Sequence, residues 1–362
     1  MTRWVWRILF VLLVLVLAGA VVFKAFQARI GAAVFERTAD RLVGADQTAR
    51  LEDGLHVYFC GTGSPLPDPT RAGPCLAVLA GETALVFDAG SGSMRKLARM
   101  GFPMGGIDHV FLTHLHSDHI DGLGELILQA WIGGSRTQPV PVSGPAGTGE
   151  VVAGFGQAYA IDATYRTAHH GEKIANPQGF GARAAELSLP PGGRVAEVFS
   201  EDGVTVSAFL VDHAPVAPAF GYRVDYKGRS VTVSGDTVRT QSVIEAAKGT
   251  DLLVHEALNR DMVAVMAEAA ADNGDVALSK IFSDILDYHA SPTEAADVAE
   301  AAGAKALVLT HIVPPLPVGL LKPAFLDGAG GHFDGALRVG EDGLVVHLPA
   351  DSQAIGYAHL LD

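Results

Sequence analysis

Three histidines and an aspartate occur within six positions of this chain, one residue after the apolar residues 110–112. They are His114, His116, Asp118 and His119. Imidazoles mixed with a carboxylate are typical ligands of zinc and its neighbours, and the mixture suggests two ions sharing one loop. In a tight loop His114 and His116 can point the same way, while Asp118 and His119 turn towards a second ion. A polar turn is the simpler alternative, but such turns use Asp, Asn, Ser and Gly rather than three imidazoles.

Metal-competent residues also follow three later apolar runs that are typical of strands. His213 follows residues 204–211, Asp236 follows residues 230–234, and His311 follows residues 306–310. Helical patterns lie between the later strands, at about residues 263–272 and 293–302, so the chain is expected to form an α/β layered fold. Loops converge at the carboxyl ends of the strands in such sheets, and ligands cluster there. The four segments therefore predict one metal centre.

Composition limits which partners and which cysteine chemistry are expected. The formal charge of −14 argues against nucleic-acid binding that depends on the net charge of the whole protein, and no run of Lys and Arg forms a local basic patch. Cys60 and Cys75 are the two cysteines, too few for a disulfide framework. One bridge between them is allowed, but two free buried thiols are expected.

The amino-terminal residues 4–23 are apolar except for Arg7, with Arg3 before them and Lys24 after them. This length is about that of a membrane-spanning helix. We expect an uncleaved anchor in residues 1–50, continued by a helical spacer, with residues 51–362 as the catalytic domain on the exported (periplasmic or extracellular) side. The alternative is a signal peptide that is cleaved near residues 18–20, which would release a secreted protein.

Other segments carry weaker signals. Residues 61–74 are rich in Gly and Pro and predict a rigid irregular loop in which Arg71 is the candidate for anion contact. Residues 160–195 are expected to be loop-rich and to face the substrate, with His169 and His170 as candidate contacts. Residues 337–347 are expected to form a closing hairpin.

With these motifs together, the chain resembles the metallo-β-lactamase superfamily and, more narrowly, its ribonuclease Z and arylsulfatase-like branch. The resemblance covers about residues 55–350. Besides the metal-competent residues, it is carried by residues 61–63, Arg71, and residues 73–74, 88–90, 144–148, 234–237, 255–257 and 289–291. It implies an αββα sandwich, two sheets back to back with helices outside, and a two-zinc centre at one edge.

The resemblance also implies a role for each site residue. His114, His116 and His213 would hold the first zinc ion, Asp118, His119 and His311 the second, and Asp236 would bridge both. Asp118 would thereby take part in catalysis through a metal-bridging hydroxide, and Asp88 would orient the histidine loop. His289 and Glu256 would supply an acid that protonates the leaving oxygen, although Leu258 and Ala290 depart from the family pattern.

Two features bear on the substrate. The chain lacks the long Gly- and Lys-rich excursion with which ribonuclease Z clamps transfer RNA, and it begins with an anchor or export segment. A small ester, such as an aryl sulfate, a phosphodiester or a lactone, is therefore the expected substrate, nucleic acid is not expected as a partner, and a homodimer is left open. The alternatives are a transfer-RNA 3′-processing endonuclease and a non-catalytic metal-binding module. A redox member of the superfamily is disfavoured because no flavodoxin-like domain or iron ligand set is present.

Overall fold

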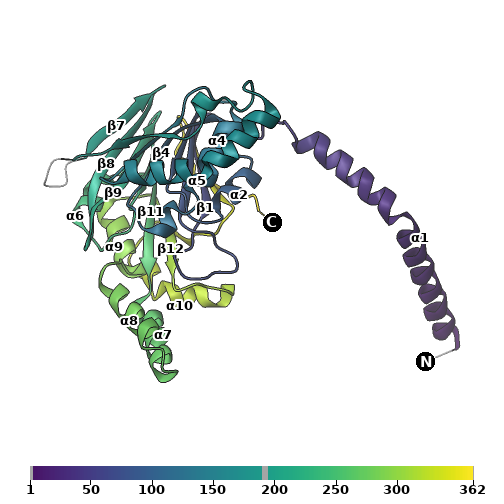
Figure 1. Cartoon of the computed structure of the whole chain (residues 1–362). Helices are drawn as coiled ribbons and strands as arrows, with labels where there is room; N and C mark the ends of the chain where they lie inside the picture. The colour runs from purple at the N-terminus through teal and green to yellow at the C-terminus, as the bar shows by residue number, and fades with distance from the viewer. Residues whose placement is uncertain (1–2, 190–194, 362) are drawn as a thin grey trace. The chain divides into compact units, whose positions relative to one another are not determined.

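The computed structural model describes residues 3–189 and 195–361, and the chain divides into two units, Met1–Arg50 and Leu51–Asp362 (Figure 1). The first unit contains helix α1 (Arg3–Leu42), a helix of 40 residues with none of them buried. By length and composition α1 could cross a membrane, since its most apolar window has a mean hydropathy of 2.8. The expected apolar segment and most of the expected spacer thus form one continuous helix.

The second unit is built on two sheets. The strand order is β15-β14-β1-β2-β3-β4-β5-β6 in the first sheet and β13-β12-β11-β10-β9-β8-β7 in the second. The strands are β1 (Gly54–Gly61), β2 (Cys75–Ala80), β3 (Thr83–Phe87), β4 (Ile107–Phe111), β5 (Val140–Gly144), β6 (Ala182–Glu186), β7 (Ala196–Glu201), β8 (Val204–His213), β9 (Val216–Tyr226), β10 (Arg229–Val233), β11 (Leu252–Leu258), β12 (Ala306–Val313), β13 (Ala336–Val339), β14 (Leu344–Pro349) and β15 (Gly356–His359).

This unit also contains a set of helices. They are α2 (Ser93–Arg99), α3 (Ser117–Ile120), α4 (Leu123–Gly133), α5 (Thr148–His170), α6 (Gln241–Ala246), α7 (Arg260–Asp272), α8 (Val276–Asp284), α9 (Pro292–Ala302) and α10 (Lys322–Leu326), with 3-10 turns η1 (Met104–Gly106), η2 (Pro177–Gly179), η3 (Ile285–Asp287), η4 (Gly319–Leu321) and η5 (Ala329–Gly331). Helices α2, α4 and α5 pack on the first sheet, and α6 and α9 on the second. Figure 1 shows α7 and α8 projecting away from the sheets.

The buried strands explain why two sheets pack together. All residues of β1 are buried, and alternate side chains face opposite ways. Leu55, Val57 and Phe59 join the core between the two sheets, together with Val231 and Val254 of the second sheet. The opposite side of β1 packs under the helices, so apolar surface is buried on both faces. This arrangement confirms the αββα sandwich.

Two local predictions are wrong. In the segment 160–195, expected to be loop-rich, residues 160–170 are helical because α5 continues through His170, and its many Ala residues favour a helix even though few of its side chains are buried. Residues 190–194 of this segment lie outside the described residues. Residues 337–347 do not form a hairpin, since β13 pairs with β12 in one sheet and β14 pairs with β1 in the other. The chain between them crosses at Asp342, whose carboxylate accepts hydrogen bonds from the Thr62 amide at 2.8 Å and the Ala72 amide at 2.6 Å.

Candidate metal centre

The histidine loop is held by Asp88, which follows β3 with a left-handed φ of 57°. One carboxylate oxygen of Asp88 accepts a hydrogen bond from the Thr113 amide at 2.8 Å, and the other accepts one from Thr113 Oγ1 at 2.8 Å. The second oxygen also lies 2.8 Å from His119 Nδ1. Asp88 therefore positions both the start and the end of the loop. Thr113 is a site residue that the sequence reasoning missed, although it directly precedes His114.

The loop passes so close to β2 and β3 that glycine is required beside it. A Cβ atom on Gly90 would lie 2.3 Å from the main-chain oxygen of Asp118. The Ala89 amide donates to the His119 main-chain oxygen at 2.8 Å, so the loop and the turn after β3 are tied through the backbone as well. The short helix α3 starts within the loop, and its first turn carries Asp118 and His119.

Asp236 lies at the centre of the site. It follows β10 and Gly235, whose φ of +63° and close approach to the Phe220 main-chain oxygen exclude a side chain. The Oδ2 atom of Asp236 lies within 3.9 Å of four imidazole nitrogens, the Nε2 atoms of His114 (3.8 Å), His119 (3.3 Å), His213 (3.9 Å) and His311 (3.2 Å). Burial raises the pKa of the Asp236 carboxyl, but His311 and His119 lower it by more, so it lies well below its usual range.

His311 reaches Asp236 because of an irregularity between two parallel strands. Glu256 of β11 pairs with Thr310 of β12, and Ala257 pairs with Ile312, so His311 is an extra residue between the two pairs. Its φ of 46° is left-handed, which is uncommon for a non-glycine residue and found at functional sites. The bulge turns the His311 side chain towards Asp236 and Asp118, as bulges near active sites often do.

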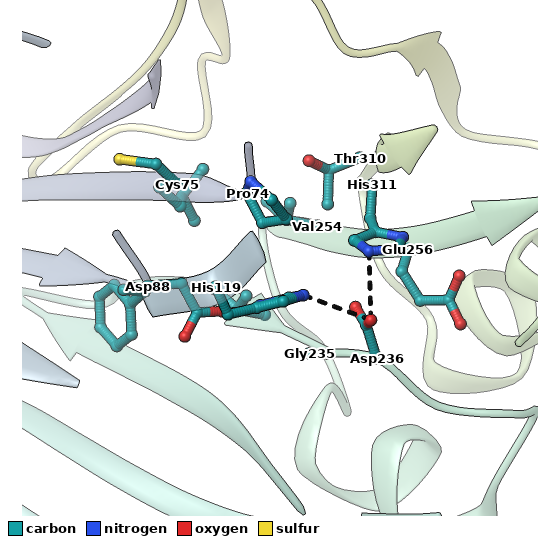
Figure 2. A pocket seen from close by; sticks show the side chains of 13 residues that line it. Pro74, Cys75, Asp88, His119, Gly235, Asp236, Val254, Glu256, Thr310 and His311 are labelled. Atoms are coloured by element: carbon teal, nitrogen blue, oxygen red, sulfur yellow. Dashed lines mark hydrogen bonds and ion pairs between the residues drawn. The ribbon is translucent and has the colours of Figure 1, made fainter. Parts of the chain in front are cut away.

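Figure 2 shows His119 and His311, which come from different elements, both pointing at Asp236. Ligand atoms within 4.8 Å of one another fall into groups that match the two-ion assignment: His114 with His116 and His213, Asp118 with His119 and His311, and Asp236 with His114 and His119. A further group joins Asp236, His289 and His311. The structure thus brings together all the residues proposed as ligands.

Orphaned nitrogen atoms indicate that this group fits metal ions. The Nε2 atoms of His119 and His213 are buried without a hydrogen-bond partner. Their Nδ1 atoms are already engaged, by Asp88 for His119 and by the Tyr288 main-chain oxygen at 3.1 Å for His213. Metal-ligating histidines commonly use one nitrogen in this way while the other binds the ion. Burial lowers the pKa of His114 and of His213, which favours the neutral, ligating form, whereas the Asp236 and Asp88 carboxylates raise the pKa of His119 despite its burial.

Beside the ligands, His289 and Glu256 form a buried pair. Glu256 Oε1 lies 3.1 Å from His289 Nδ1 and also accepts hydrogen bonds from the amides of Ala290 (3.0 Å) and Thr237 (3.2 Å). Burial alone would lower the pKa of His289, but the Glu256 carboxylate raises it to about 9. The loop ends in a capping box, in which Ser291 and Glu294 satisfy the first amides of α9. This raised pKa favours the protonated form of the imidazole, and the Glu256 contact fixes its position.

The candidate substrate contacts have other partners. The side chain of Arg71 is 5% exposed, with its guanidinium donating to the Gly340 main-chain oxygen at 3.2 Å and lying 3.7 Å from Asp68. His169 and His170 are exposed at the carboxyl end of α5, with ring centroids 4.8 Å apart. Among the described residues, the groups of potential ligands include neither of these two histidines.

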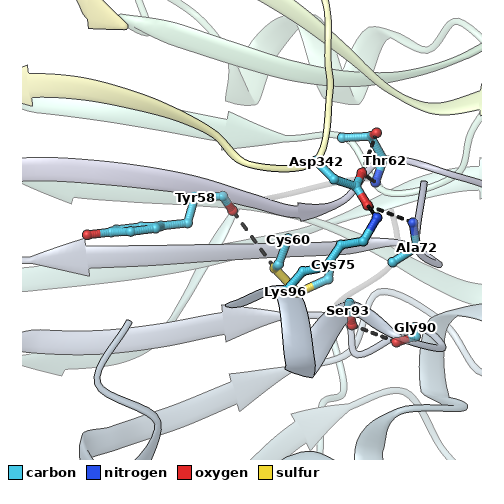
Figure 3. The surroundings of a disulfide bond; sticks show 9 residues. All are labelled: Tyr58, Cys60, Thr62, Ala72, Cys75, Gly90, Ser93, Lys96 and Asp342. Carbon is cyan, nitrogen blue, oxygen red and sulfur yellow. Dashed lines mark hydrogen bonds and ion pairs between the residues drawn. A yellow bond between two sulfur atoms is a disulfide. The ribbon is translucent and has the colours of Figure 1, made fainter. Parts of the chain in front are cut away.

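Cys60 and Cys75 form a disulfide, so the expectation of two free thiols is wrong (Figure 3). The antiparallel pairing of β1 and β2 explains it. Phe59 pairs with Leu76 and Gly61 with Cys75, which leaves Cys60 as an extra residue beside Cys75, with the two Cα atoms 5.1 Å apart. The bridge closes the loop that contains Arg71, and Cys75 also lines the small cavity under His119 and Asp236.

Comparison with known proteins agrees with this geometry. The model of the "Beta-lactamase superfamily domain" family matches residues 83–312. The chain is 37% identical over 305 residues to "Ribonuclease Z" of Mycobacterium avium (strain 104), which covers 82% of this chain and 100% of that protein. It is also 37% identical over 295 residues to "Ribonuclease Z" of Mycobacterium bovis (strain BCG / Pasteur 1173P2), covering 80% of this chain and 96% of that protein.

Two solved structures share the fold. Human tRNase Z, short form, superposes with a TM-score of 0.58 at 24% identity, covering 81% of this chain and 99% of that one. The metallo-β-lactamase fold protein YhfI from Bacillus subtilis superposes with a TM-score of 0.56 at 22% identity, with the same coverage of 81% and 99%. The family match and the sequence relatives identify the family as well as the fold. The chain belongs to the metallo-β-lactamase superfamily, in its ribonuclease Z branch.

Proposed function

We propose that this chain is a metal-dependent endoribonuclease of the ribonuclease Z type, which hydrolyses a phosphodiester bond near the 3′ end of precursor transfer RNA. The coarser statement, a hydrolase of the metallo-β-lactamase fold, follows from the family. The observation that supports the proposed ribonuclease activity is the sequence match to proteins named Ribonuclease Z over their whole length. The ligand cluster and the His289–Glu256 pair support it, because together they suit hydrolysis of a phosphodiester.

The expectation of a small ester as substrate, with nucleic acid not expected as a partner, is corrected by these relatives. The formal charge of −14 is a poor guide because it counts carboxylates that the fold uses internally. Asp236 and Asp118 lie among the candidate ligands, and Asp88 and Glu256 bind imidazoles beside them. Recognition of one phosphate depends on the local field at the site, where divalent ions would outweigh these charges.

Hydrolases of this family use divalent metals, and we assign two zinc ions to this chain. The proposed ligands are His114, His116, Asp118, His119, His213, Asp236 and His311. When bound, the ions would lower the pKa of water and offset the charge of the phosphate. The chain's own residues do the rest. Asp88 and the Tyr288 main chain orient His119 and His213, and His289 donates its proton to the leaving ribose oxygen as water attacks phosphorus.

The proposal is tested with the full chain in detergent and a precursor transfer RNA that carries a 3′ trailer. We expect cleavage near the 3′ end, loss of cleavage after metal chelation and recovery when zinc is added back. Mature transfer RNA is the matched control and should not be shortened. A protein that retains two ions without cleaving any RNA would instead support the non-catalytic metal-binding alternative.

Two features support a further proposal about location. Helix α1 contains the apolar residues 8–23 and has no buried residue, and the Cys60–Cys75 disulfide is typical of an oxidising compartment. We assign α1 as a membrane anchor and place the catalytic unit on the oxidising side of the membrane. The enzyme would then bind its RNA substrate on that side. A phosphatase reporter that requires export, fused after Asp362, should then be active and remain with the membranes. Activity only of a reporter that requires the cytoplasm would contradict this assignment.

A further inference from the structure

Tyr288 joins the proposed acid to the proposed ligands. It lies between the 3-10 turn η3 and His289. Its main-chain oxygen accepts a hydrogen bond from His213 Nδ1 at 3.1 Å, as described above. Its ring lies against two imidazoles at once, with centroids 4.7 Å from the His213 ring and 4.5 Å from the His289 ring. The side chain is therefore next to the place where a phosphodiester must bind.

The Tyr288 ring differs from the other rings in the site. Among the ring contacts that the six site histidines make within the described part of the chain, Tyr288 supplies the one ring that is not an imidazole. The other rings belong to His114, His116, His119, His213, His289 and His311. Tyr288 is only half-buried, whereas His213 and His289 are buried. Part of the Tyr288 side chain is thus accessible where the buried histidines are not.

Tyr288 presents an aromatic surface directly beside charged and metal-competent groups. Its ring lies against His213 and His289, and the Asp236 carboxylate lies 3.9 Å from His213 Nε2. Proteins that bind single-stranded RNA stack unpaired bases on surfaces of this kind.

We propose that Tyr288 is a specificity residue whose ring stacks on the base of a nucleotide adjoining the scissile phosphate. This inference rests on the proposed ribonuclease function. It follows from position, since a phosphate within reach of both His289 and Asp236 places its neighbouring nucleotides near the half-buried ring of Tyr288, which contacts His289 and His213. An aromatic stack tolerates any base, so the residue would favour an unpaired nucleotide at this position rather than a particular base.

The experiment pairs the protein side chain with the RNA base. Precursor transfer RNAs are made with an abasic site at either nucleotide that flanks the cleavage position, and KM and kcat are measured for the wild type and for Tyr288→Ala, Tyr288→Phe and Tyr288→Trp. With the wild type, one abasic position should raise KM on the order of 10- to 100-fold. Tyr288→Ala should raise KM by a similar factor on intact RNA and show little further loss on that abasic RNA. Phe and Trp should restore the sensitivity to the base.

Controls separate this role from a structural one. Tyr288→Ala keeps the main-chain oxygen that orients His213, so its metal content should match that of the wild type. Tyr357→Ala, which removes a half-buried tyrosine of β15 whose ring lies 4.0 Å from the Arg338 guanidinium, should leave KM unchanged. Equal losses by Tyr288→Ala on intact and abasic RNA would overturn the stacking role while leaving the ribonuclease assignment in place. A metal-loaded wild type that cleaves none of these RNAs would instead reject the proposed function.

Discussion

Asp236→Ala should remove most of both metal ions and abolish RNA cleavage. One oxygen of this carboxylate lies within 3.9 Å of the Nε2 atoms of four histidines, so the change removes the group common to both proposed sites. Loss of a residue that merely supports a ligand costs about 10- to 100-fold in metal affinity, and a shared ligand should cost at least the upper value. Metal content of the purified protein, measured by mass spectrometry after dialysis, checks this prediction.

The matched control is Asp225→Ala. Asp225 is an aspartate of the same sheet whose carboxylate pairs with Arg223 at 2.8 Å at the surface. This variant should keep both ions and full activity. If the Asp236→Ala protein instead holds a tight ion and folds normally, the bridging assignment is wrong, and two separate sites or a single site would have to replace it.

His289→Ala should slow cleavage by about 10²- to 10⁴-fold without loss of metal. The imidazole is buried beside Glu256 with a pKa raised to about 9, so it carries a proton at neutral pH and can pass it to an alkoxide-like leaving oxygen. An activated diester with a nitrophenolate leaving group needs no such proton and should lose much less. His332→Ala is the control, because it removes an exposed histidine that is paired with Asp297 at 2.9 Å.

The same pair predicts a pH profile. A general acid must be protonated, so the rate should be independent of the His289 proton below about pH 9 and fall about tenfold per pH unit above it. Glu256→Gln removes the carboxylate that raises this pKa, and the decline should then begin at a lower pH, towards the ordinary histidine value of 6.5. An unchanged profile in Glu256→Gln, or loss of metal in His289→Ala, would remove the pair from the acid role.

Much of the site was predictable because its signals are local. His114, His213 and Asp236 stand at or just after the ends of apolar strands, and the convergence of such ends in an α/β sheet is a general rule. The sandwich itself followed from the resemblance that these residues carry, and the fold confirms it. The His289–Glu256 contact joins residues 33 positions apart, and only the family resemblance pointed to it.

What the sequence did not predict depends on register and on pairing between distant segments. The Cys60–Cys75 bridge depends on a register shift between Phe59 and Gly61 in the pairing of β1 with β2. Amino-acid composition does not predict such a shift. The hairpin prediction is wrong because β13 and β14 pair with strands of different sheets. An alternating apolar pattern predicts a strand but does not identify the strand with which it pairs. Tyr288 was missed because a lone aromatic residue in a loop has no sequence signal until its neighbours, His213 and His289, are placed.

The source of the oxygen at the new RNA end tests the central claim most directly. Precursor transfer RNA is cleaved in a single turnover by the metal-loaded full chain in oxygen-18 water, and the fragments are analysed by mass spectrometry. If water attacks phosphorus at this centre, one oxygen-18 atom should appear in a terminal phosphate, and chelation should stop the reaction. A 2′,3′-cyclic phosphate without oxygen-18 would show attack by the RNA's own 2′-hydroxyl and would contradict the account.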